Sequence, residues 1–150
     1  MNKSIKIERF ELPDDISSEI YFSKFFPVKQ LIKKGLMKRT KYGITLTKEF
    51  KSTITKQMEK LQLSHKLISK FKERRYLEID LEKLWNPIVC AVTEVNGCEC
   101  TIKSDGVYVS SNFADTIMKE ASAIYNWFKH IKNVLEKANK DNLKIMGDYV

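Results

Sequence analysis

The chain has 150 residues, of which 43% are hydrophobic and 31% charged, and its formal net charge is +8. This composition is typical of one globular domain, or of one domain with a small appendage, and the low glycine and proline content disfavours long unstructured stretches. No apolar run reaches the roughly 18 residues needed to span a bilayer, and the first residues lack the apolar block of a secretory signal. We therefore expect an intracellular (cytoplasmic) protein.

The N-terminal region predicts a short strand and two helices. Alternating apolar residues indicate a strand before Pro13. Asp14 and Asp15 are typical N-terminal residues of a helix that would continue to Tyr21. A second helix is expected over residues 28–34 and would end at Gly35, because glycine adopts a positive φ at low cost.

Residues 36–46 predict a small β-hairpin with its turn at Gly43. Thr47 is a typical N-cap for the helix that follows, which carries apolar residues at every third or fourth position. Ser64 indicates a restart of the helix, and Asp80 indicates a short helical turn that Pro87 would stop.

The C-terminal region predicts a three-stranded antiparallel meander. Its strands would cover residues 88–95, 98–103 and 107–110, with tight turns at Asn96–Gly97 and Asp105–Gly106. A long amphipathic helix then carries an apolar stripe from Phe113 to Leu135, which we expect to cover the apolar face of the meander. Part of this stripe would either pack in the core or form the seam of a homodimer, and the sequence leaves both interpretations open.

These elements define an α+β fold. A helical, basic N-terminal region over residues 1–76 would contain the small hairpin, and residues 77–150 would form the meander packed on the long helix. The two regions could also be one continuous domain.

No catalytic, metal or cofactor site is predicted. The three cysteines, Cys90, Cys98 and Cys100, are an odd number, and we expect them to be reduced thiols that pack as small hydrophobic residues. A Cys-x-Cys pair is shorter than the usual zinc spacing, and neither histidine has a partner at a recognisable spacing. The sequence contains no phosphate-binding loop, dinucleotide fingerprint or nucleophile elbow, so we do not expect an enzyme.

The positive charge is concentrated in the middle of the sequence. Residues 24–75 contain sixteen of the 27 Lys and Arg residues and three of the 19 Asp and Glu residues, whereas both flanking regions are slightly acidic. A codon bias toward lysine would raise the lysine content everywhere and would not confine the excess to one region. Such segregation of charge attracts a polyanion.

The run from Ser23 to Phe50 resembles the recognition helix and wing of winged-helix DNA-binding domains. The resemblance covers under a fifth of the chain and depends on an apolar helix, a Lys-Lys-Gly-Leu turn, a basic strand, a glycine and an Ile-Thr-Leu-Thr-Lys-Glu-Phe run. In that family the helix enters the major groove, and the wing contacts the backbone or the minor groove. The resemblance places seven basic residues and one tyrosine at the nucleic acid: Lys29, Lys33 and Lys34 on the helix, Lys38, Arg39, Lys41 and Tyr42 on the wing, and Lys48 at the start of the next helix.

A second basic cluster ends at Arg74 and Arg75. It would either extend a track for phosphates, with Phe71 or Tyr76 as a stacking surface for bases, or form the solvated end of a helix.

The sequence therefore predicts a small nucleic-acid-binding protein, with DNA favoured over RNA, and most specifically a transcription regulator. The alternative hypothesis is a viral or phage-type interaction module that binds an acidic host protein through the same basic patch. Both hypotheses depend on lysine and arginine side chains that are exposed together.

Overall fold

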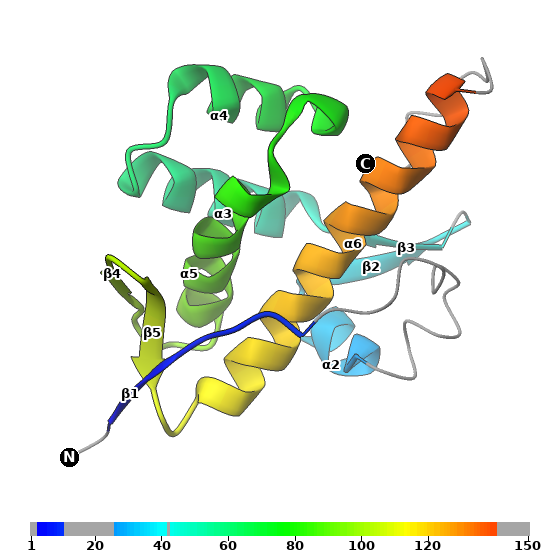
Figure 1. The fold of residues 1–150 in the computed structure, drawn as a ribbon. Helices are drawn as coiled ribbons and strands as arrows, with labels where there is room; N and C mark the ends of the chain where they lie inside the picture. Colours follow the sequence, from blue (N-terminus) through cyan, green and yellow to red (C-terminus); the bar gives the residue numbers. More distant parts are fainter. Residues whose placement is uncertain (1–2, 11–25, 42, 141–150) are drawn as a thin grey trace.

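The computed structural model describes residues 3–10, 26–41 and 43–140 (Figure 1). The described part is α+β, as predicted, with two small antiparallel sheets and a long C-terminal helix. The helix predicted over residues 14–21 lies outside the described residues. In chain order, the elements are β1 (Ser4–Lys6), α2 (Val28–Lys33), β2 (Met37–Thr40), β3 (Gly43–Leu46), α3 (Lys48–Lys60), α4 (His65–Lys72), the 3-10 turns η1 (Tyr76–Glu78) and η2 (Leu81–Leu84), α5 (Trp85–Val95), β4 (Thr101–Lys103), β5 (Gly106–Ser110) and α6 (Ala114–Lys140).

The helix–hairpin–helix arrangement around residues 28–60 is confirmed. Gly35 follows α2 with a φ of 78°, and β2 pairs with β3 across the turn that ends at Gly43. The Thr47 hydroxyl accepts a hydrogen bond from the Phe50 amide at 3.1 Å and donates one to the Gly35 carbonyl at 2.6 Å. One side chain therefore caps α3 and closes the base of the hairpin.

The prediction of a strand over residues 88–95 was wrong, because this segment forms most of helix α5. All residues from Pro87 to Thr93 are buried, so the apolar run has no exposed face that would reveal a helical period. Pro87 lies in the first turn of the helix, where a missing amide costs little, and therefore does not stop it. Gly97, with a φ of 74°, ends α5 and does not form a hairpin turn.

A three-stranded antiparallel sheet is present, but its strands differ from the predicted ones. Its order is β1–β5–β4, so the third strand comes from the N-terminus and pairs with β5 in the register Ile5 to Val109. A tight turn between β4 and β5 is confirmed, but it lies at Ser104–Asp105, and Gly106 is the first residue of β5. The sheet contacts α5 through β5, and α5 in turn packs against α3 and α6.

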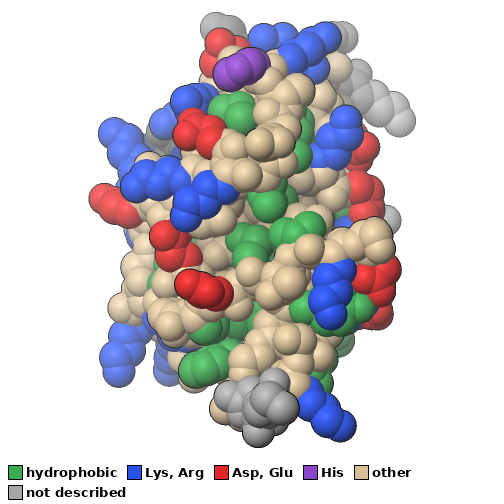
Figure 2. Space-filling model, turned by 90° about the vertical axis from the view of Figure 1, so that its left-hand side faces the viewer, with side chains coloured by type: hydrophobic (Ala, Val, Ile, Leu, Met, Phe, Trp, Pro, Cys, Tyr) green, Lys and Arg blue, Asp and Glu red, His purple; other side chains and the backbone are tan. Residues whose placement is uncertain are grey.

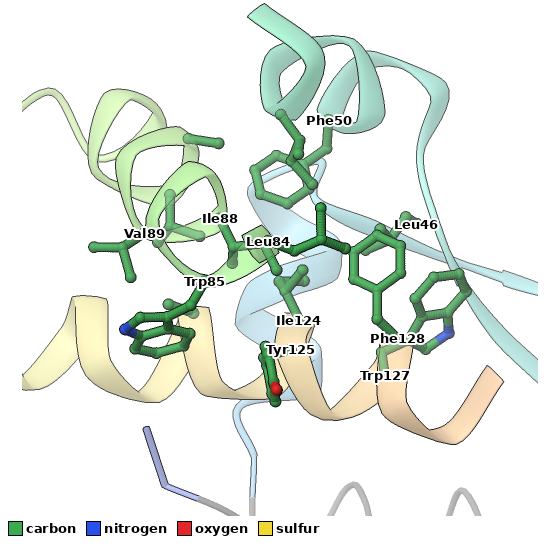
Figure 3. Close-up of a cluster of buried hydrophobic side chains, with 14 of the residues drawn as sticks. Leu46, Phe50, Leu84, Trp85, Ile88, Val89, Ile124, Tyr125, Trp127 and Phe128 are labelled. Carbon is green, nitrogen blue, oxygen red and sulfur yellow. The ribbon is translucent and has the colours of Figure 1, made fainter. Parts of the chain in front are cut away.

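The hydrophobic core is one cluster that includes residues from Ile7 to Leu135. It therefore takes side chains from both regions of the predicted division at residue 76. The apolar stripe of α6 is part of this core, and its side chains from Ile117 to Leu135 pack within the chain. Figure 3 shows Ile124 and Phe128 of α6 facing Leu84 and Ile88, with Phe50 of α3 above them.

The expectation of reduced thiols is overturned for two of the three cysteines. Cys90 of α5 forms a disulfide with Cys100, which immediately precedes β4. The turn at Gly97 brings the chain back against α5, and the two Cα atoms are 5.6 Å apart. Cys98 is a free, half-buried thiol, and burial raises its pKa.

In the part of the chain that the structure describes, none of the helices has the length and apolar character that a membrane-spanning helix requires.

Candidate nucleic-acid interface

The lysines of α2 and its C-terminus have different environments. Lys29 and Lys33 are exposed. Lys34 is also exposed, but its ammonium lies 2.6 Å from a Glu120 carboxylate oxygen and 2.7 Å from the Asn96 side-chain oxygen. The Glu120 side chain is only 1% exposed, so the Lys34 charge compensates a buried carboxylate. Lys34 was predicted to face nucleic acid, but the structure assigns it to the joint between α2, α5 and α6.

The hairpin presents three of the predicted cations. Lys38 and Arg39 on β2 and Lys41 in the turn are all exposed, whereas Tyr42 lies outside the described residues. The hairpin is also held against the core, because the Trp127 indole nitrogen of α6 donates a 2.9 Å hydrogen bond to the Ile44 carbonyl of β3. The partner strand of the basic strand β2 is therefore bonded to α6, the longest helix among the described residues.

Cations from three elements meet around Lys51, which the sequence analysis did not single out. Lys51 is half-buried on α3, and burial together with the charges of Arg74, Lys38 and Lys48 lowers its pKa to about 8. Positions 48, 51 and 55 share one helix face, and this spacing is the signal that could have identified Lys51. The structure thus joins the hairpin cluster and the second basic cluster into one cationic site.

This site surrounds a pocket of about 290 Å³. Helices α3 and α4 pack against each other and run in opposite directions in Figure 1, so the start of α3 and the end of α4 lie at the same end of the pair. The pocket opens there, next to the hairpin. It is lined by Lys48, Lys51, Ser52, Thr55, Phe71, Lys72, Arg74 and Tyr76.

Arg74 and Arg75 have different roles. Arg74 follows the end of α4 with a φ of 63°, and its side chain lines the pocket. Arg75 forms ion pairs with Glu73 at 3.2 Å and with Glu78 at 2.5 Å, and these two carboxylates raise its pKa. The Arg75 charge is therefore largely compensated, and of the two predicted arginines only Arg74 belongs to the pocket.

The interpretation of Phe71 and Tyr76 as a stacking surface was wrong. The two side chains are 3% and 1% exposed and pack against each other and against Phe128. The Tyr76 hydroxyl has no hydrogen-bond partner among the described residues, and burial raises its pKa to about 12 against the opposing effect of Arg74. The floor of the pocket is thus aromatic carbon, and the Tyr76 hydroxyl itself is buried.

The described residues that line the pocket include no acidic side chain, although Glu59 lies 3.7 Å from Lys72. The face seen in Figure 2 differs, because there Lys and Arg side chains are interspersed with Asp, Glu and hydrophobic side chains. The described residues also contain no group of three His, Cys, Asp or Glu side chains that could hold a metal ion.

Comparisons with protein-family models, with curated proteins and with solved structures gave no match.

Proposed function

We propose that this protein binds nucleic acid through the cationic site formed by Lys38, Lys48, Lys51 and Arg74. The observation that carries the proposal is the convergence of these side chains from β2, α3 and the end of α4 around one pocket. Four cations that repel one another are stabilised by a polyanion, and phosphate contacts of this kind provide most of the affinity of non-specific nucleic-acid binding.

The exposed cations outside the pocket extend this surface. Arg39 and Lys41 on the hairpin and Lys29 and Lys33 on α2 remain accessible to a phosphate backbone. In a winged-helix arrangement, α2 would lie in the major groove of DNA and the hairpin along the backbone, and a transcription regulator would use both. Lys34 and Arg75 are left out of this surface, because their charges are compensated within the chain.

The first test measures binding of a fluorescent duplex of mixed sequence at rising salt concentration. If about four phosphates are contacted, the logarithm of the association constant falls with the logarithm of salt with a slope of about −3 to −4. A parallel titration with polyglutamate of equal charge tests the acidic-protein alternative. Tighter binding of the duplex than of polyglutamate supports the proposal, and equal or weaker binding contradicts it.

A further inference from the structure

The pocket between α3 and α4 has features that attraction to a polyanion does not require. A flat row of lysines is sufficient to bind a phosphate backbone without sequence specificity. Here, in contrast, Lys48, Lys51 and Arg74 line a pocket of about 290 Å³, and Ser52 and Thr55 are also part of its lining. This volume is close to the lower limit for small-molecule sites in proteins.

We propose that this pocket binds a phosphomonoester dianion, the group present at a phosphorylated strand end and on a mononucleotide. The strand-end form of this inference rests on the proposed function, whereas the mononucleotide form does not. Phosphomonoester is the shared chemistry, and the experiment below separates the two sources.

Charge favours a monoester over an internal diester. A phosphomonoester carries between −1.5 and −2 charges at neutral pH and offers three acceptor oxygens, roughly twice the charge of a diester. The pocket concentrates the charges of Lys48, Lys51 and Arg74, and its described lining contains no carboxylate. These cations repel one another, since the charges of Arg74 and Lys48 contribute to the lowered pKa of Lys51. The more highly charged ligand relieves this repulsion most.

Shape leads to the same ligand. An internal phosphodiester continues as a chain in two directions, whereas a terminal phosphate can enter a concave pocket from one side. The walls come from the first two turns of α3, from Phe71 and Lys72 at the end of α4, and from Arg74 and Tyr76 beyond it, so the ligand would lie at one end of the helix pair. The positive end of the α3 dipole also lies here and favours an anion.

The aromatic floor of the pocket contributes shape and not a hydrogen bond to the ligand. Phe71 and Tyr76 line the pocket but are 3% and 1% exposed, and the Tyr76 hydroxyl is buried. A nucleobase would not be held by stacking, because Phe71 and Tyr76 have no exposed ring face.

The test compares ligands that differ by one phosphate. The ligands are a 5′-phosphorylated and a 5′-hydroxyl oligonucleotide, a nucleoside monophosphate and its nucleoside, and inorganic phosphate alone, each titrated into the full chain by calorimetry. We expect each phosphorylated ligand to bind about tenfold or more tightly than its unphosphorylated counterpart, the size of one charge-assisted hydrogen bond.

Three variants locate the effect. Lys51→Gln and Arg74→Gln should each remove most of the preference for the phosphorylated ligand. Lys83→Gln, which removes an exposed lysine of η2 outside the pocket and outside the proposed binding surface, should leave the preference unchanged. Thermal melting of each variant shows whether the fold is retained. If Lys51→Gln unfolds, Lys51→Arg replaces it in the test. Because this variant keeps the charge, it should retain at least part of the preference.

The outcomes distinguish this inference from the proposed function. Equal binding of the two oligonucleotides, with no binding of the monophosphate or inorganic phosphate, overturns the pocket inference and leaves nucleic-acid binding intact. Binding of the monophosphate without binding of either oligonucleotide supports the pocket and contradicts the proposed function. A phosphate preference that Lys83→Gln abolishes as completely as Lys51→Gln does would also overturn the inference.

Discussion

Arg74 occupies a backbone position that favours glycine. Its φ of 63° lies in the left-handed region, and the same geometry follows α3 at Gln62, where φ is 59°. Two other helices in the described chain end with glycine at this position, Gly35 after α2 and Gly97 after α5. A side chain in this conformation costs about 1 kcal/mol relative to glycine, so an arginine here is retained at the expense of stability.

We expect Arg74→Gly to have opposite effects on stability and on binding. Relief of backbone strain should raise the free energy of unfolding by up to about 1 kcal/mol. The greater freedom of glycine in the unfolded chain opposes this gain and makes it smaller. Loss of the guanidinium should weaken nucleic-acid binding several-fold. Urea denaturation and a binding titration measure the two effects.

Gln62→Gly is the matched control for this prediction. It changes the same backbone position after α3, at a residue that does not line the pocket. It should stabilise the protein to a similar extent and leave binding unchanged. A loss of affinity in Gln62→Gly equal to that in Arg74→Gly would show that the effect comes from helix-end geometry and not from the guanidinium.

At the scale of elements, α2 is joined to the rest of the fold by a polar network. Lys34 after α2, Asn96 after α5 and Glu120 of α6 share three hydrogen bonds of 2.6 to 2.8 Å. Removal of Lys34 would leave a carboxylate that is 1% exposed without its cation. Removal of one partner from a buried ion pair is among the most destabilising changes in proteins.

Lys34→Met should therefore lower the free energy of unfolding by about 2 to 3 kcal/mol, below the full value for a buried pair because Lys34 is partly exposed. Lys33→Met, at the neighbouring exposed position, should change stability by less than about 0.5 kcal/mol. The double variant Lys34→Met/Glu120→Gln should be more stable than Lys34→Met alone, because no unpaired charge remains. Urea denaturation measures the free energy of unfolding of each variant. Equal losses in Lys34→Met and Lys33→Met would contradict this account.

Local signals in the sequence predicted several elements correctly. The hairpin, its glycines and the Thr47 cap depend on residues within a few positions of one another, and Ser64 caps α4 in the same way through the Leu67 amide. The long helix α6 was evident from its apolar period. The segment over residues 88–95 was misread because a helix that is buried on nearly all sides has no amphipathic pattern, and its β-branched residues favour a strand reading.

Features that depend on distant segments could not be predicted. The pairing of β1 with β5 joins residues about one hundred positions apart, and no local pattern specifies it. The same holds for the candidate site. Lys38, Lys48 and Arg74 were recognised as basic, but their convergence on Lys51 requires the antiparallel packing of α3 and α4. Which cations remain uncompensated also depends on tertiary contacts, as the Lys34–Glu120 pair shows.

At the scale of the whole molecule, the net charge of +8 is less informative than its arrangement. Acidic side chains compensate Lys34 and Arg75 and lie near Lys72, whereas the pocket between α3 and α4 has no acidic residue in its described lining. A homodimer through α6 stays a prediction, and the part of its stripe from Ile117 to Leu135 is already packed in the core of the single chain.

The central claim is that the arrangement of cations, and not their number, determines binding. The most direct measurement compares the salt dependence of DNA binding for two triple variants of equal charge. One removes three exposed cations around the pocket, Lys38→Gln/Lys48→Gln/Arg74→Gln. The other removes three exposed lysines elsewhere, Lys83→Gln/Lys103→Gln/Lys119→Gln.

The account predicts that the first variant reduces the slope of log affinity against log salt by about two to three, as expected for the loss of three phosphate contacts, and that the second changes it by less than one. If the slope and the affinity decrease equally in both variants, binding follows net charge alone and the claim is contradicted.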